Sequence, residues 1–422
     1  MSWRLTIFII LICVISLVLR LYRLAEPNRY YFDEVYHAVT AKAYADNNPA
    51  AYDPFAPAPR EGTAYDWLHP PLAKLIQALS IKILGDNSLG WRLPSAIFGV
   101  ALIAAVFVLT NIFFGAKSAI FASLIIAFEN LTFVMSRITM NDIFLSFFVV
   151  VSFIWTTEYI RFQRVRDLII SCIFLGLAIS TKWTGIYAIG VVGSFILWDQ
   201  IQKKSLSLKF LLLLFIPGVI YLVSYGQFWL QGHNAKQFID LHKQIWWYQN
   251  REDLKHSYGT TALFCAPEGL DAMKTWCPWI LDVRPVYFSY EQYGEKAGYI
   301  YALGNPLIFW GGIVSISYLI GRLIEERKRE IAFLLAGYFV FWLPWVFAPR
   351  ILFLYHYLPS IPFLAISIGV FLSDIYKSKF KYLAILGLLA IILTFFFFYP
   401  ITSGYPITPE SIEKFMWLKT WR

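Results

Sequence analysis

The chain has 422 residues, of which 58% are hydrophobic, and a formal net charge of +9. The apolar residues form long blocks separated by short charged stretches. Blocks of roughly 20 apolar residues, long enough to cross a bilayer, recur along the chain. This pattern excludes a soluble multidomain protein and predicts an all-α polytopic membrane protein that is a single membrane domain over residues 1–422. The cations lie between the apolar blocks, which argues against nucleic-acid binding.

About eleven membrane-spanning helices are predicted. In chain order they cover residues 5–24, 92–113, 118–136, 140–160, 167–181, 184–198, 208–226, 305–322, 331–347, 351–373 and 382–399. The first block follows Arg4 but is too long for a signal peptide and has no small-residue cleavage site after it, so we expect a retained helix.

Basic residues in alternate loops predict the orientation. The five clusters are Lys117; Arg161, Arg164 and Arg166; Lys203, Lys204 and Lys209; Arg322, Arg327, Lys328 and Arg329; and Lys377, Lys379 and Lys381. By the positive-inside rule these loops and the N-terminus are cytoplasmic, which places the C-terminus outside.

Two longer segments, 25–91 and 227–304, are predicted to lie on the outer side. Within the first, "HPPLAKLIQALSIKIL" begins with Pro70 and Pro71, which suit the first turn of a helix. Its apolar residues recur at helical spacing, but the helix is too short to span, so we expect it to lie in the membrane interface.

Charged side chains near the outer ends of the predicted spans are candidate functional groups, because charge at membrane depth is costly. They are Asp33, Glu34, His69, Arg137, Asp142, Lys182, Arg350 and His356. Cations beside carboxylates suit transfer of a group from a lipid-linked phosphate: cations stabilise the departing phosphate, and one carboxylate takes the proton of an attacking hydroxyl. No His/Cys pattern has zinc-ligand spacing, so no structural metal is expected; a divalent cation at the acidic site stays open.

Each candidate also has a purely structural interpretation. Asp33 or Glu34 could be an ordinary acid at a helix N-terminus, and Asp142 in "SRITMNDIF" could cap the following helix. His69 could simply precede a helix, and Lys182 could extend to the interface. Glu129 has no assigned role.

Several stretches together resemble one family. They are "FDEVYHA", "DWLHPPLAK", "GWRLPSAIFG", "SRITMNDIFLSFF", "GLAISTKWTGIYA", "RPVYFSYE", "ALGNPLIFW" and "RILFLYHYLPSIPFL". In this order, from about residue 28 to the C-terminus, they resemble the dolichyl- or polyprenyl-phosphate-mannose protein O-mannosyltransferases, which are membrane glycosyltransferases of the GT-C type.

The resemblance implies eleven spans and an active site at the outer membrane face. It implies that Asp33 is the catalytic base and that Glu34 supports it or the acceptor. Arg137 and Asp142 fall in the family's turn between its third and fourth helices. His69, Arg350, His356 and Tyr357 fall at positions where members of the family and its relatives contact the donor phosphate. Residues 227–304 are too short for the MIR domain of eukaryotic members, so the chain resembles a prokaryotic enzyme.

The preferred function is an inverting transferase in the plasma membrane. It would move mannose or a related hexose from a polyprenyl phosphate to Ser or Thr hydroxyls of exported proteins. One alternative keeps the donor and uses a lipid or cell-wall glycan as acceptor. A transporter or flippase is the third reading, and it is disfavoured because the charges gather at one face and no repeated halves are apparent.

Cys265 and Cys277 lie in the large outer segment, where thiols tend to oxidise. A disulfide between them would close a short loop and add roughly 3 kcal/mol of stability by the chain-entropy estimate. The alternative is two free thiols held apart. We expect mass spectrometry of the unreduced, alkylated protein to find one cross-linked peptide; alkylated Cys265 and Cys277 would rule the bridge out.

Overall fold

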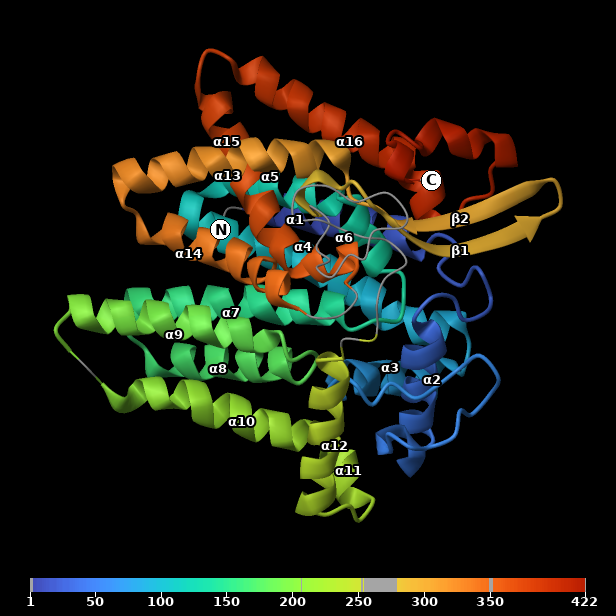
Figure 1. Ribbon diagram of the computed structural model, residues 1–422. Coiled ribbons are helices and arrows are strands. Elements are labelled where there is room, and N and C mark those ends of the chain that lie inside the picture. The colour runs from blue at the N-terminus through green and yellow to red at the C-terminus, as the bar shows by residue number, and fades with distance from the viewer. Residues whose placement is uncertain (1–2, 206, 252, 254–278, 349–351, 422) are drawn as a thin grey trace. The chain divides into compact units, whose positions relative to one another are not determined.

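The computed structural model describes residues 3–205, 207–251, 253, 279–348 and 352–421. The chain divides into two compact units (Figure 1). The first unit comprises Met1–Pro27, Gly99–Arg137 and Glu252–Arg422, and the second comprises Asn28–Phe98 and Ile138–Arg251. The expected organisation as one membrane domain with two long outer segments stays a prediction.

The first unit is a helical bundle with a β-hairpin. Its elements are α1 (Trp3–Leu21), most of α4 (Ser88–Phe114), α5 (Ala116–Ala127), α6 (Asn130–Met135), β1 (Val286–Tyr293), β2 (Lys296–Ala302), α13 (Pro306–Glu326), α14 (Arg329–Val340), α15 (Ile361–Lys377) and α16 (Lys381–Ser403). Helix α15 contacts α5, α13, α14 and α16. It is the central helix of this unit, which explains why all of its residues from Ile361 to Val370 are buried.

The second unit contains the start of α4 and the remaining helices. They are α2 (Glu34–Ala45), α3 (Leu72–Leu84), α7 (Asp142–Phe162), α8 (Val165–Ile179), α9 (Gly185–Gln202), α10 (Leu212–Ser224), α11 (Gly226–Leu230) and α12 (Ala235–Gln249). Helices α7, α8, α9 and α10 lie side by side, and α2 packs on α3 (Figure 1). Aromatic residues including Tyr44 of α2, Tyr225 between α10 and α11, and Phe228 of α11 form a core cluster there.

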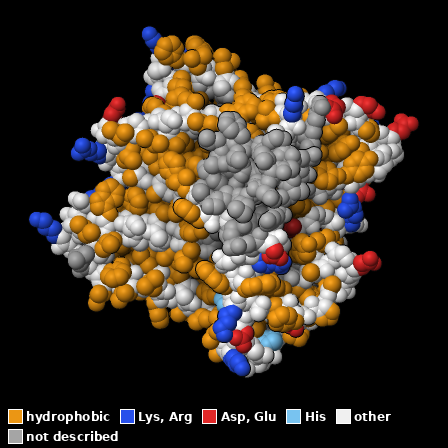
Figure 2. Space-filling model, viewed as in Figure 1, with side chains coloured by type: hydrophobic (Ala, Val, Ile, Leu, Met, Phe, Trp, Pro, Cys, Tyr) orange, Lys and Arg blue, Asp and Glu red, His pale blue; other side chains and the backbone are white. Residues whose placement is uncertain are grey.

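Among the described residues, six helices are long and apolar enough to cross a membrane. They are Trp3–Leu21, Ser88–Phe114, Asp142–Phe162, Pro306–Glu326, Leu354–Lys377 (which begins as a 3-10 turn) and Lys381–Ser403; Ala116–Ala127 and Leu208–Ser224 are shorter apolar helices. Apolar side chains cover much of the surface seen in Figure 2, as expected for a chain in contact with lipid.

Two sequence expectations are corrected. The span predicted over 118–136 is not continuous: α5 ends before Phe128, and the Glu129 carboxylate caps α6 by accepting hydrogen bonds from the N–H groups of Leu131 (3.0 Å) and Thr132 (2.6 Å).

The structure is mostly helical rather than all-α, because β1 and β2 pair antiparallel within the segment 227–304. Gly294 has a φ of +62° at their turn, a conformation that favours glycine. The short helix predicted after Pro71 is confirmed as α3.

Helix α15 packs tightly against α5 at Gly369. A Cβ placed there would lie 2.7 Å from the Ala122 N atom and 2.8 Å from the Ala122 Cβ atom. We therefore expect Gly369→Ala to destabilise the protein by about 1–3 kcal/mol through overpacking, measured as a lower melting temperature in detergent. Gly321→Ala is the control, because nothing lies within 4 Å of a Cβ there and alanine favours helix. Equal melting temperatures for the two variants would contradict this account of the packing.

Candidate active site

The adjacent acids Asp33 and Glu34, at the start of α2, have different environments. Glu34 is fully buried, and Arg92 binds it as a fork: Nε donates to Oε1 and Nη2 to Oε2, both at 2.8 Å. The backbone N–H and the hydroxyl of Thr139 donate to Oε1 at 3.1 and 3.2 Å. A bidentate charged pair of this kind is both strong and geometrically specific. Glu34 therefore holds α2, α4 and the turn before α7 together.

Asp33, by contrast, is only partly buried. It occupies the N-cap position of α2, a place that fits the alternative of an ordinary acid at a helix N-terminus, although its side chain makes no capping hydrogen bond. Burial raises the pKa of Tyr36, and the nearby Asp33 carboxylate raises that pKa further. The preceding residue, Phe32, has a φ of +48°, a conformation that is costly for a non-glycine residue and is often found at functional sites.

Asp66 is the centre of a second buried cluster, which the sequence analysis did not single out. Lys74 Nζ lies 2.7 Å from Asp66 Oδ2, and His37 Nδ1 lies 2.8 Å from the same oxygen. The rings of His37 and His69 stack with centroids 6.0 Å apart. Burial alone would raise the pKa of Asp66, but attraction to Lys74, His37 and His69 outweighs burial and holds that pKa well below its ordinary value. The carboxyl is therefore charged at neutral pH.

His69 has the opposite electrostatic character. Burial lowers its pKa well below the ordinary value, and the cations Lys182 and Lys74 lower it further, against the attraction of Asp66. The imidazole is therefore neutral near pH 7 and is available as a hydrogen-bonding group rather than as a cation.

The third pair of the second unit joins Lys182 to Asp142. Lys182 Nζ lies 2.7 Å from Asp142 Oδ1, and both side chains are buried. Lys182 therefore points inward rather than out to the interface, and Asp142 follows the N-cap residue Asn141 instead of being the cap. Sequence analysis found both members of this pair but did not join them.

Signals for the missed residues were present in the motifs. His37 follows Asp33 by four residues, one turn along α2, and Asp66 and Lys74 are the charged ends of "DWLHPPLAK". Arg92 lies in "GWRLPSAIFG". Pairing these residues required knowledge of which segments are neighbours.

Arg137, in the first unit, binds the backbone where helices end. Its Nη1 donates to the carbonyl oxygens of Arg20 and Tyr22 (2.8 Å), and its Nη2 donates to those of Arg23 (3.3 Å) and Ser403 (3.2 Å). Cations are favourable at helix C-termini, where carbonyl groups have no intrahelical partner. These contacts give Arg137 a structural role; its predicted contact with the donor phosphate stays a prediction.

His356 and Tyr357 lie in a buried aromatic group of the same unit. The His356 ring is parallel to that of Trp279, with centroids 6.3 Å apart, and the Tyr357 hydroxyl lies 2.8 Å from the Tyr338 hydroxyl. Arg350, Cys265 and Cys277 are outside the described residues.

The described part of the chain contains no group of three or more His, Cys, Asp or Glu side chains placed to hold a metal ion. Both oxygens of Glu34 accept from Arg92, and Oε1 also accepts from Thr139. Glu34 thus does not fit as a ligand for the divalent cation that the sequence analysis left open, and no step below uses one.

Comparison with known proteins covers the whole chain. The family profile described as dolichyl-phosphate-mannose-protein mannosyltransferase matches residues 10–231, and the profile described as the C-terminal four TMM region of protein-O-mannosyltransferase matches residues 234–421. The polyprenol-phosphate-mannose–protein mannosyltransferase of Mycobacterium tuberculosis H37Rv is 24% identical, over 100% of this chain and 92% of that protein. Dolichyl-phosphate-mannose–protein mannosyltransferase 1 of Saccharomyces cerevisiae is 27% identical over 44% of this chain and 24% of that protein.

Solved structures share the fold at low identity. The S. cerevisiae protein O-mannosyltransferase Pmt1–Pmt2 complex bound to the sugar donor matches with a TM-score of 0.81 and 16% identity, covering 100% of this chain and 93% of that chain. ArnT from Cupriavidus metallidurans bound to undecaprenyl phosphate matches with a TM-score of 0.62 and 14% identity, covering 95% and 77%. The fold is therefore of the GT-C type.

Since Glu34 and Arg92 are fully buried together, breaking the pair should be costly. We expect Glu34→Gln to lose about 3–5 kcal/mol of stability, because the Arg92 charge would remain buried without compensation. Glu158→Gln is the control: its partner Arg164 is 3.3 Å away and 42% exposed, and such pairs contribute about 0–1 kcal/mol. Melting curves in detergent compare the two, and a Glu34→Gln melting temperature as high as that of the control would refute the structural role of Glu34.

Proposed function

The chain belongs to the protein O-mannosyltransferase family, and on that premise we propose that it transfers mannose from a polyprenyl phosphate donor to Ser or Thr hydroxyls of exported proteins. The resemblance expected from the sequence motifs is thereby confirmed. The mycobacterial relatives, matched over the full length of this chain, are named for the same donor and a protein acceptor. The enzyme is a mannosyltransferase of the membrane.

Asp33 is the proposed catalytic base. The observation that carries this assignment is the contrast between the two acids: Glu34 is sealed and bonded by Arg92, whereas Asp33 is partly exposed. In the proposed step the acceptor hydroxyl oxygen attacks the anomeric carbon of mannose, and its proton passes to Asp33. The bond from that carbon to the phosphate oxygen breaks, and the bonding electrons leave with the polyprenyl phosphate. Attack opposite the leaving group inverts the anomeric configuration.

Four of the candidate residues from the sequence analysis are proposed to bind the phosphate group of the donor. Arg350 would bind its oxygens, since a guanidinium is suited to forked hydrogen bonding with phosphate. His69 is proposed as an uncharged hydrogen-bond donor, which its lowered pKa supports, and His356 and Tyr357 are proposed as further hydrogen-bond donors. A donor-bound structure in which the phosphate lies beyond hydrogen-bonding distance of Arg350 and His356 would remove this assignment.

The proposed topology has eleven spans, a cytoplasmic N-terminus and an extracytoplasmic active site in the plasma membrane. It is supported by the basic residues Arg164, Lys203 and Lys377, which lie at or just beyond the helix ends expected inside. It is also supported by the apolar helices found at the predicted positions.

We expect Asp33→Asn to fold and bind donor but to transfer mannose about 10²- to 10⁴-fold more slowly, because it removes the base while leaving the Glu34–Arg92 pair intact. The assay incubates purified protein with labelled polyprenyl-phosphate-mannose and an exported-protein peptide, and follows label on the peptide. Asp53→Asn, a change at an exposed acid of the same segment, is the control and should keep full activity.

Near-normal transfer by Asp33→Asn would overturn the mechanism. Label found on lipid or glycan instead of peptide, with the wild-type enzyme, would leave the mechanism standing and replace the proposed acceptor.

A further inference from the structure

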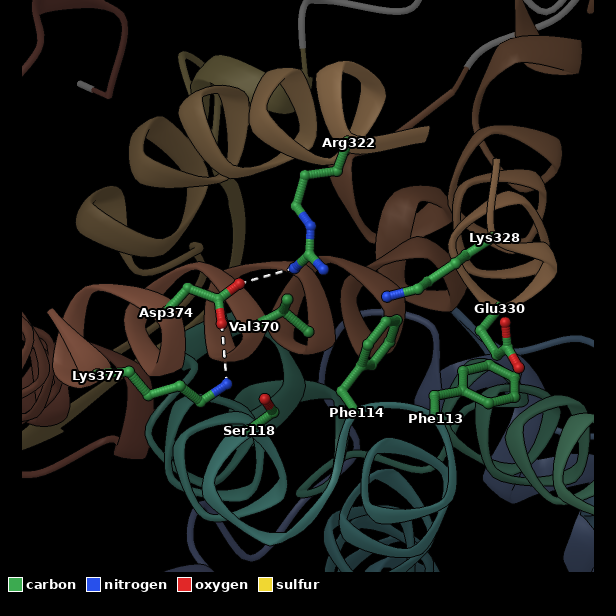
Figure 3. A pocket seen from close by; sticks show the side chains of 9 residues that line it. All are labelled: Phe113, Phe114, Ser118, Arg322, Lys328, Glu330, Val370, Asp374 and Lys377. Carbon is green, nitrogen blue, oxygen red and sulfur yellow. Dashed lines mark hydrogen bonds and ion pairs between the residues drawn. The ribbon is translucent and has the colours of Figure 1, made fainter. Parts of the chain in front are cut away.

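A polar cavity of about 330 Å³ lies in the first unit, at the helix ends opposite those near the predicted outer residues Arg137 and His356 of the same unit. It is formed where α4 and α13 end, α5 and α14 begin, and α15 ends (Figure 3). Its lining includes three cations, Arg322, Lys328 and Lys377, and the apolar side chains of Phe114 and Val370. Nothing in the transfer reaction uses this cavity.

Ion pairs position the three cations but use only part of their hydrogen-bonding capacity. Arg322 Nη1 lies 2.7 Å from Asp374 Oδ2, its Nε donates to Glu326 at 2.5 Å, and Lys377 Nζ lies 2.9 Å from Asp374 Oδ1. Lys328 pairs with Glu326 at 2.6 Å. An arginine has five N–H donors and a lysine has three, so N–H groups remain for a ligand. Figure 3 shows Arg322 and Lys328 extending toward each other over the cavity.

The surrounding helix ends have an excess of positive charge. Residues 113–119, 322–330 and 374–382 together contain eight Lys or Arg residues and four Asp or Glu residues. An anion entering the cavity would therefore be attracted both by the lining cations and by the wider field.

The rim of the cavity has the composition of a membrane interface. Lys117 Nζ lies over the Tyr376 ring at 5.7 Å, and Lys381 Nζ lies over the Tyr382 ring at 5.0 Å. The side chains of Tyr382 and Ile324 are exposed. Aromatic rings beside lysines anchor helices at headgroup depth, and these loops are the ones expected at the cytoplasmic surface.

We propose that this cavity binds the phosphate headgroup of an anionic phospholipid from the cytoplasmic leaflet. Basic pockets between helix ends on this side of a membrane suit such headgroups. A cavity of this volume accommodates a glycerophosphate group, and the acyl chains would lie against the exposed apolar helix faces outside it. The lipid would tie together the ends of α5, α13, α14 and α15.

The test measures binding of short-chain phosphatidylglycerol to the purified full-length protein, with phosphatidylcholine of the same chain length for comparison. The wild-type protein is expected to bind phosphatidylglycerol at least tenfold more tightly. The double variant Lys328→Gln and Lys377→Gln should raise the Kd for phosphatidylglycerol by about 30-fold, because each such cation contributes about a fivefold factor. Both side chains are about half exposed, so the variant should fold with an unchanged melting temperature.

The matched control changes Lys203 and Lys209 to Gln, at helix ends that are also expected on the cytoplasmic side. Lys203 pairs with Asp199 one helical turn away at 2.7 Å, as Lys377 pairs with Asp374. The Kd of this control variant for phosphatidylglycerol should stay within about twofold of the wild-type value. Equal binding of both lipids by wild type, or equal losses in the two double variants, would overturn the proposal. Displacement of phosphatidylglycerol by equimolar glycerol phosphate would also overturn it, because the site would then serve a soluble phosphate.

Discussion

The Glu34–Arg92 pair determines the geometry at the start of α2, beside Asp33, the proposed catalytic base. A carboxylate and a guanidinium that are both fully buried must satisfy each other's hydrogen bonds, since neither can use water. The two parallel hydrogen bonds between Arg92 and Glu34 allow few positions of α2 relative to the start of α4. The two hydrogen bonds that Thr139 donates to Glu34 also fix the turn before α7. The backbone of Asp33, one residue earlier, is therefore positioned by the contacts of the neighbouring Glu34 side chain.

The same requirement organises the rest of the second unit. Asp66 with Lys74, and Asp142 with Lys182, are also buried acid–base pairs. Their charges cancel locally, which allows several ionised groups to lie near one another inside an apolar fold. Asp33 differs from Asp66 and Asp142 in remaining partly exposed. The three acids thus differ in burial although they are the same residue type.

In the first unit, cations are used at helix ends. Arg137 binds carbonyl groups at the C-terminal ends of α1 and α16, and Arg322 joins α13 to α15 through Asp374. A guanidinium suits both roles because its several N–H donors can bind more than one acceptor at once. Arg322 also lines the polar cavity, where N–H groups that its ion pairs do not use can bind a ligand.

The sequence alone determined the class of the protein and the approximate positions of its six long apolar helices among the described residues, and it singled out Asp33, Glu34 and Asp142 as candidate functional acids. These features follow from hydrophobic length and from the cost of charge near lipid, both of which are local properties of the chain. The break at Glu129 was not predicted, because an acid inside an apolar block becomes a cap only where the backbone N–H groups that follow it are free to donate hydrogen bonds to its carboxylate. The pairing of β1 with β2 was also missed, in a segment interpreted as a polar loop.

Only the tertiary structure decided which candidates are partners. Glu34 and Arg92 are 58 residues apart, and Lys182 and Asp142 are 40 residues apart, so no periodicity links them. Asp33 and Glu34 are adjacent and chemically alike, and the sequence could not tell them apart. Their environments differ because folding buries one carboxylate against a guanidinium and leaves the other partly exposed, a difference set by contacts distant in the chain.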